Sequence, residues 1–188
     1  DQIIHWTPKD PQSVLIEFRS PYEDDPKVMR MSVDSGAIKL AQGRAHDIRE
    51  WYADSQGNIR AGTATQRNRY QLWARIETDA RLVKVLEHHL FEEEGPVFAG
   101  FHADPAKLYV AAPHEGRAAL YEFDLATRVL GTRVFAHPAV DMDGVKRDPG
   151  PERRVVGVHY TVDRPEIHFF DEAAERELLG DARALQGR

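Results

Sequence analysis

The sequence predicts an all-β protein built from about four β-propeller blades, each a four-stranded antiparallel sheet. The first observation is a module of about 47 residues that occurs four times, a repeat length typical of propellers. Each module contains a strand that ends in a step from a large apolar residue to an acidic one. The second observation is an apolar run that precedes each of these strands, in phase with the first landmark. The four steps are Val33-Asp34, Ile76-Glu77, Phe123-Asp124 and Phe170-Asp171.

These landmarks assign residues 1–170 to the propeller and leave a segment with a different pattern at 171–188. Within the propeller, apolar and polar residues alternate with period two over short runs. Gly, Pro, Asn and Asp separate these runs, as expected for strands joined by turns. The predicted modules are 1–43, 44–90, 91–137 and 138–170.

The first two modules are each expected to contribute four strands. In module 2 the sequence DSQGN at 54–58 predicts the turn of the first hairpin. In module 1 a segment at 21–26, with proline at both ends, is expected to form an exposed loop. The expected strands are 3–6, 14–18, 28–33 and 38–40 in module 1, and 48–53, 59–64, 70–76 and 82–86 in module 2.

Module 3 repeats this pattern, whereas module 4 departs from it after its third strand. Where a fourth strand is due, the sequence predicts a helix, with Asp171 as its N-cap and Glu172 and Glu175 near its positive N-terminal end. Its apolar face is expected to consist of Leu178, Leu179, Ala182 and Leu185. The expected strands are 97–102, 108–112, 120–123 and 129–135 in module 3, and 140–146, 155–160 and 167–170 in module 4.

Aromatic side chains are expected to pack between the blades, because blades contact one another through apolar faces. The missing strand of module 4 and the abrupt start of module 1 favour an open arc of a larger propeller. Such an arc leaves two faces uncovered, so we expect exposed apolar patches or association with a second copy. The aromatic residues assigned to the core are Trp51, Trp73, Phe101, Tyr109, Tyr121, Phe123, Tyr160 and Phe169.

The composition argues against several classes of partner. With 31 acidic and 25 basic residues the net charge is −6, and no continuous basic track suited to nucleic acid is visible. No segment approaches the roughly 20 apolar residues of a membrane span, so no membrane partner is expected. The chain has no cysteine and therefore no disulfide or thiolate site. The N-terminal residues show no signal pattern, and the composition suits periplasm and cytoplasm alike.

Charged residues on the innermost strands are the candidates for ligand binding, because these strands line the central channel of a propeller. The substrate-binding candidates are Asp47, Arg49, Glu50, Asp141 and Asp143. A pair of carboxylates among them would suit glycoside hydrolysis if the two groups lay roughly 5 to 9.5 Å apart. Hydrated charges at strand ends are nevertheless the more common arrangement.

One cluster contains several residue types that bind metals: His88-His89 followed by Glu92-Glu93-Glu94. Zinc and calcium need three or four convergent ligands, and this spacing matches no usual site pattern. We therefore predict a solvated loop, no metal and no cofactor. The sequence also lacks a G-x-S-x-G motif, a P-loop and a helix-opening G-x-G-x-x-G, so no catalytic residue is assigned.

Several segments of modules 3 and 4 resemble the N-terminal propeller of bacterial prolyl oligopeptidase family serine peptidases. These segments are VFAHP (134–138), VVGVHY (155–160), DRP (163–165) and HFFD (168–171). The resemblance implies a propeller that precedes an α/β-hydrolase domain and restricts the entry of peptides. It also implies that the C-terminal helix connects to that domain. This chain contains no hydrolase domain and no triad motif, so the resemblance assigns no catalytic residue here.

The leading hypothesis is a non-catalytic propeller portion of such a peptidase, which gates and selects peptide substrates. Its expected partners are the hydrolase domain of the parent protein and the peptide substrate, and peptide hydrolysis would belong to the parent protein. One alternative is a stand-alone propeller that binds proteins or ligands. A third hypothesis is a small propeller enzyme that acts on glycans. Fold alone does not choose among these, because propellers support many functions.

Overall fold

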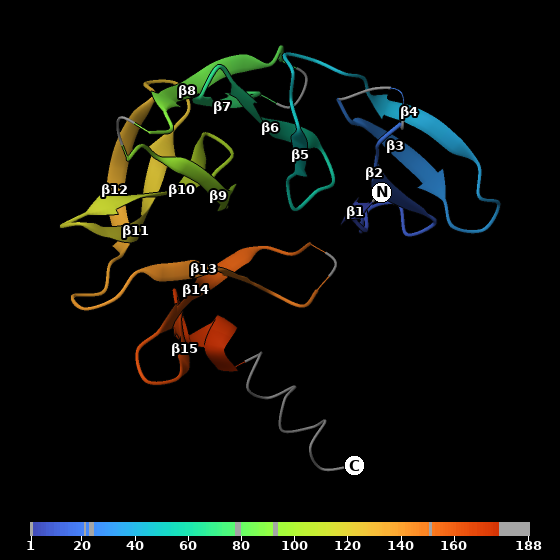
Figure 1. Ribbon diagram of the computed structural model, residues 1–188. Helices are drawn as coiled ribbons and strands as arrows, with labels where there is room; N and C mark the ends of the chain where they lie inside the picture. Colours follow the sequence, from blue (N-terminus) through green and yellow to red (C-terminus); the bar gives the residue numbers. More distant parts are fainter. Residues whose placement is uncertain are drawn as a thin grey trace.

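The computed structural model describes residues 2–20, 22, 25–77, 80–91, 94–150 and 152–176. In this part of the chain, fifteen strands form four antiparallel sheets that succeed one another along the sequence (Figure 1). Strands pair in sequence order within every sheet, so each sheet is a meander and forms one propeller blade. The all-β propeller predicted from the repeat is confirmed.

Each of the fifteen expected strands has a counterpart in the structure. Blade 1 contains β1 (Gln2–His5), β2 (Ser13–Phe18), β3 (Lys27–Ser32) and β4 (Ile38–Gln42). Blade 2 contains β5 (Glu50–Ala53), β6 (Ile59–Gln66), β7 (Arg69–Ala74) and β8 (Val83–His89). Blade 3 contains β9 (Val97–Phe101), β10 (Lys107–His114), β11 (Arg117–Asp124) and β12 (Val129–Phe135). Among the residues that the structure describes, blade 4 contains β13 (Met142–Arg147), β14 (Val155–Thr161) and β15 (Pro165–Phe169) and no fourth strand, in agreement with the prediction.

One difference from the expected boundaries is at the start of β5, which begins at Glu50 rather than at residue 48. His46 and Asp47 have φ angles of 53° and 56°, in the left-handed region, so the chain turns just before the strand. Ile48 lies in this connection and is buried against Trp51 instead of extending the sheet.

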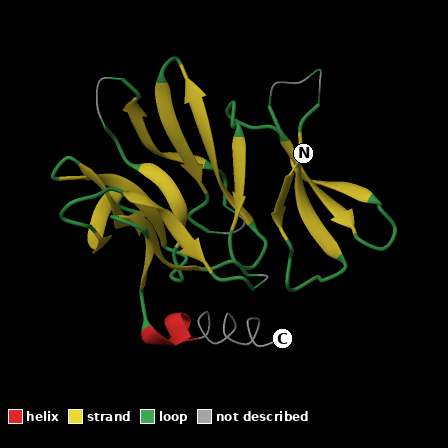
Figure 2. Ribbon diagram, turned by 60° about the horizontal axis from the view of Figure 1, so that its bottom comes forward, coloured by secondary structure: helices red, strands yellow, loops and turns green. Residues whose placement is uncertain are grey.

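The C-terminal helix begins as predicted. Residues 172–176 are helical, and Asp171 acts as the N-cap: its Oδ1 accepts a hydrogen bond of 2.7 Å from the backbone N–H of Ala174. Figure 2 shows this helix beyond the last strand of blade 4. The predicted apolar face at Leu178, Leu179, Ala182 and Leu185 lies outside the described residues. Within the described residues, no helix is long and apolar enough to cross a membrane.

Three hydrophobic clusters join consecutive blades. Leu15 and Val28 of blade 1 pack with Trp51 of blade 2. The sheet of blade 2 has one face toward blade 1 and the other toward blade 3. The row Trp51–Gly62–Trp73 faces blade 1, whereas the row Tyr52–Ala61–Ala74–Val83 faces blade 3. The cluster between blades 2 and 3 is built around Leu72, Leu108, Val110 and Phe123, and the one between blades 3 and 4 around Tyr109, Leu120, Met142 and Val158.

Two of the predicted core aromatics are not members of these clusters. Phe169 pairs with Gly157, and therefore lies on the face of blade 4 opposite to Val158. Its neighbour Phe170 takes the expected place and packs against blade 3. Tyr160 contacts the rings of Phe135 and His137 at centroid distances of 5.3 and 5.2 Å.

Blade 1 has an uncovered apolar face opposite to blade 2. Strand register places Ile3, Ile16, Met29 and Leu40 in one row across all four strands of the blade. Leu40 is 61% exposed and Ile3 46% exposed. In the described part of the chain no hydrophobic cluster joins blade 4 to blade 1, so this face has the exposure expected for an open arc.

Candidate functional site

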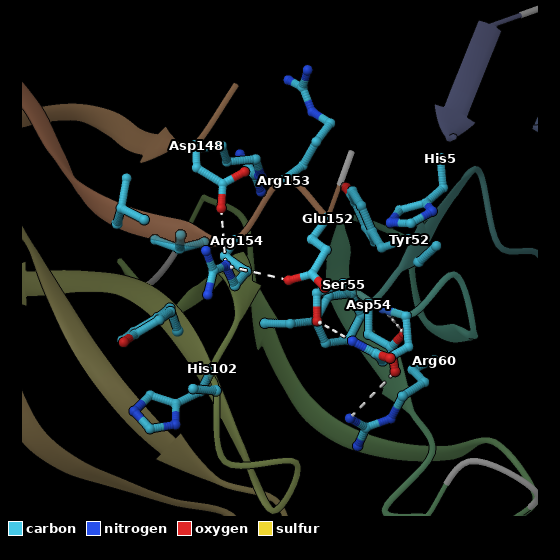
Figure 3. A pocket seen from close by; sticks show the side chains of 18 of the residues that line it. His5, Tyr52, Asp54, Ser55, Arg60, His102, Asp148, Glu152, Arg153 and Arg154 are labelled. Carbon is cyan, nitrogen blue, oxygen red and sulfur yellow. Dashed lines mark hydrogen bonds and ion pairs between the residues drawn. The ribbon is translucent and has the colours of Figure 1, made fainter. Parts of the chain in front are cut away.

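A cavity of about 1030 Å³ lies where the innermost strands of the four blades end. Its walls come from β1, from the last residues of β5, β9 and β13, from the loops that follow these strands, from the nearby parts of β6, β10 and β14, and from the start of the C-terminal helix. The first strand of every blade in the arc therefore delivers its following loop to the same place, which brings together segments far apart in sequence (Figure 3).

One part of the lining is aromatic. The rings of Tyr52 and Phe98 lie 4.4 Å apart between centroids, and those of Phe98 and Phe101 lie 5.3 Å apart. Trp6 is 51% exposed and lies within the lining, whereas Trp51 is buried. Aromatic faces of this kind provide contact area for apolar side chains and for planar groups.

Tyr52 is held in position by a hydrogen bond along its own strand. Its hydroxyl donates to Glu50 Oε2 at 2.5 Å and lies 3.3 Å from Thr63 Oγ1. Burial and the neighbouring carboxylate of Glu50 raise the pKa of Tyr52, so the phenol stays protonated as a donor.

Arg60 forms a buried polar wall of the cavity and ties blade 2 to blade 3. Only 4% of its side chain is exposed. Its Nη2 donates to the carbonyls of Arg75, Ile76 and Pro105 at 3.1, 3.3 and 2.7 Å, and its Nη1 lies 3.9 Å from Asp54 Oδ2. Burial lowers the pKa of Arg60, and the Asp54 carboxylate opposes this change.

The loop after β13 adds a group of charges opposite Arg60 (Figure 3). Arg154 Nε contacts Asp148 Oδ2 at 3.0 Å and Glu152 Oε2 at 3.4 Å. Arg147 Nη2 donates to the carbonyl of Ala99 at 3.0 Å, which links the end of β13 to blade 3. Burial lowers the pKa of Arg147, and the nearby charge of Arg153 lowers it further.

His5 lies on the blade 1 side of the cavity and is only 2% exposed. Its Nδ1 accepts a hydrogen bond of 2.9 Å from the backbone N–H of Thr7, so the proton of the neutral ring is on Nε2. Nε2 is buried and makes no hydrogen bond of good geometry, although the backbone of Glu152 interacts with the ring. His5 therefore brings an unused donor to the cavity wall.

The buried position of His5 predicts a pH dependence of stability. Burial lowers the pKa of His5 below 6.5, Asp54 and the backbone of Glu152 oppose this, and Arg153 and Arg30 add to it. Since the unfolded state then binds the proton more tightly, the stability contributed by neutral His5 is present above a pH of about 6.5 and lost as the pH falls through the folded-state pKa. We expect wild type to lose more unfolding free energy than His5→Asn when the pH falls from about 7.5 to about 5.5. Urea denaturation at both pH values measures this, and identical losses in the two proteins would contradict the assignment.

The charged residues proposed from the sequence lie elsewhere. They precede or begin β5 and β13, whereas the cavity surrounds the other ends of these strands, and none is among the lining residues. Each has its own partner: Asp47 binds Gln66 Nε2 at 2.6 Å, Arg49 lies 3.5 Å from Asp25, Glu50 binds Tyr52, Asp141 accepts from the Ala118 N–H at 2.6 Å, and Asp143 accepts from Thr161 Oγ1 at 2.8 Å. The structure thus does not bring these side chains together at the cavity, and their role in binding remains a prediction.

Sequence reasoning missed His5, Arg60, Asp148 and Arg153, although the run of charges from residue 146 to residue 154 was a visible signal. Among the histidines, His88 is buried and its ring lies 5.2 Å from that of Tyr70. The residues that the structure describes contain no group of three potential metal ligands, and Glu92 and Glu93 lie outside them.

Four meander blades with a lined cavity at one end define this chain as a β-propeller protein with a candidate binding site. No protein-family model and no curated protein matches it. Solved structures do. TolB from Acinetobacter baumannii has a TM-score of 0.51 at 16% identity, over 86% of this chain and 39% of its own. The uncharacterized protein lmo1340 from Listeria monocytogenes EGD-e has a TM-score of 0.54 at 11% identity, over 90% of this chain and 53% of its own.

The β-propeller domain of the Trilobed protease from Pyrococcus furiosus is a weaker match, with a TM-score of 0.43 at 12% identity over 84% of this chain and 53% of its own. The chain spans about half the length of these structures or less. At such identities the similarity shows the propeller fold alone, and a TM-score below 0.5 carries no argument about function.

Proposed function

We propose that this chain is a non-catalytic propeller that binds peptide segments at its cavity and so selects substrates for a peptidase of the prolyl oligopeptidase type. The observation that carries the proposal is where the unused hydrogen-bonding groups lie. In the described part of the chain, four buried side-chain atoms have no partner, and three belong to residues that line the cavity. These three atoms are His5 Nε2, Arg60 Nε and Asp148 Oδ1.

A peptide has the chemistry that these atoms need. Two of them are donors and one is an acceptor, and each buried group left unpaired costs about 1–3 kcal/mol. A peptide backbone provides a carbonyl and an N–H at every residue apart from proline, so one ligand can satisfy both kinds of group. The aromatic wall beside them suits the side chains of an extended peptide.

Tryptophan fluorescence tests this proposal directly, because Trp6 and Trp51 both line the cavity. A mixture of random peptides about six residues long, titrated into the chain, should change the emission in a saturable manner. Because Trp6 is half exposed, Trp6→Phe should remove much of this change without affecting folding. Matched titrations with oligosaccharides should give no saturable signal.

The same samples are assayed for peptide cleavage. We expect bound peptides to be recovered intact, since the chain has no serine-hydrolase motif. Cleavage with ordinary enzymatic turnover by this chain would refute the non-catalytic role. An absence of peptide binding would refute the proposal, and saturable binding of oligosaccharides alone would favour glycan recognition.

A further inference from the structure

The charges that line the cavity are unequally paired. All four carboxylates have partners: Asp54 accepts from the backbone N–H groups of Gln56 and Asn58 at 2.9 and 3.0 Å, Asp148 and Glu152 contact Arg154, and Asp171 caps the helix. Each negative group of the lining therefore already has a partner within the protein itself.

Two of the cations in the lining are not neutralised in this way. Arg147 donates to the carbonyl of Ala99 but meets no carboxylate among the described residues. Arg153 is exposed, and its side chain makes no hydrogen bond or ion pair within that same part of the chain; only its backbone N–H is bonded, to the carbonyl of Gly150 at 3.1 Å. Arg153 lines the same cavity as His5 and Arg147, and its charge lowers the pKa of both. We call these three residues, His5, Arg147 and Arg153, the basic rim.

The basic rim contains a built donor as well as charge. The Nε2–H of His5 is buried and makes no hydrogen bond of good geometry, and His5 and Arg153 both line the cavity (Figure 3). The basic rim thus presents two guanidinium groups, of which only that of Arg147 has a protein acceptor, the Ala99 carbonyl, together with one imidazole N–H. Such a set binds an anion, and hydrogen bonds to an ionised acceptor are about twice as strong as neutral ones.

We propose that the basic rim binds the C-terminal carboxylate of a peptide. This inference rests on the proposed function, since it specifies which end of the peptide the cavity recognises. Two features favour a carboxylate with an adjoining amide. Asp148 and Glu152 lie in the same loop, so their charges oppose a dianion such as phosphate more than a monoanion. The unpaired Asp148 Oδ1 requires a donor close to the bound anion, and the last N–H of a peptide provides one.

The test compares two mixtures of random peptides about six residues long, both made without Asp or Glu. One has free C-termini and the other has C-terminal amides. Tryptophan fluorescence should show that the free acids bind about 10- to 100-fold more tightly, because amidation removes a charge-assisted interaction. Arg153→Gln should lower the affinity for the acids toward that for the amides and leave the amides unchanged.

Arg128→Gln is the matched control. Arg128 is also an exposed arginine with a positive φ, 60° against 50° for Arg153, but it does not line the cavity. Its substitution should leave both affinities as in wild type. An equal effect of Arg128→Gln and Arg153→Gln would mean that net charge, and not the basic rim, is responsible, and would overturn the proposal.

The outcomes separate this inference from the proposed function. If acids and amides bind equally well, carboxylate recognition is wrong while peptide binding stands. If neither mixture binds, the proposed function fails and this inference fails with it. In a third mixture, amidated peptides that contain Asp or Glu should bind as weakly as the other amides. Binding as tight as that of the free acids would assign the basic rim to acidic side chains and overturn C-terminal recognition.

Discussion

Replacing Trp51 with alanine should lower the free energy of unfolding by about 3–5 kcal/mol. Trp51 is 2% exposed and packs between blades 1 and 2 with Leu15, Val28 and Ile48. Its indole Nε1 donates to the carbonyl of Pro26 in blade 1 at 3.0 Å. The substitution removes a large apolar volume and also leaves that carbonyl without its donor. Circular dichroism during urea denaturation measures the loss without relying on tryptophan emission.

Trp6→Ala is the matched control, because Trp6 is the same residue type at 51% exposure. Its loss of stability should remain below about 1 kcal/mol. A similar loss in the two variants would mean that the contact between blades 1 and 2 does not depend on Trp51.

Replacing Arg60 with alanine should cost about 3–5 kcal/mol, since it removes a buried cation that three backbone carbonyls and one carboxylate share. One of these carbonyls belongs to Pro105 in blade 3, so the change also weakens the contact between blades 2 and 3. The guanidinium lies 5.8 Å from the ring centroid of Phe101, and this cation–π contact is lost as well. Urea denaturation of the purified variant measures the effect.

Arg69→Ala provides the comparison for Arg60→Ala. Arg69 is half exposed on the neighbouring strand and lies 3.5 Å from Glu87. Exposed ion pairs contribute about 0–1 kcal/mol, so this variant should be nearly as stable as wild type. If Arg60→Ala were equally mild, the buried guanidinium would not stabilise the junction of blades 2 and 3.

The strands were predictable because their signals are local. An apolar and polar alternation over five to eight residues, bounded by turn residues, is enough to place a strand such as β12, whose expected and observed ranges agree at 129–135. The N-cap at Asp171 depends on a contact with Ala174, three residues away, and was found for the same reason. The start of β5 was missed because the left-handed turn at His46 and Asp47 has no strong sequence signature.

The binding cavity was not predictable in this way. Its lining combines His5, Arg60 and Arg153, which are separated by dozens of residues and carried by three different blades. The sequence pointed instead to charges such as Asp47 and Asp143, which lie at the start of the innermost strands. Which end of a strand meets the cavity depends on how the blades are arranged around their axis, and no pattern within one blade contains that information.

The sequence by itself determined the repeat, the class of fold, the number of blades and the strands within each blade, because period-two alternation and turn residues act over a few neighbours. Only the tertiary structure decided which loops meet at the cavity, which blade face stays uncovered and which polar atoms are left without partners. These properties depend on packing between blades, where burial and hydrogen bonding join residues that are far apart in the chain.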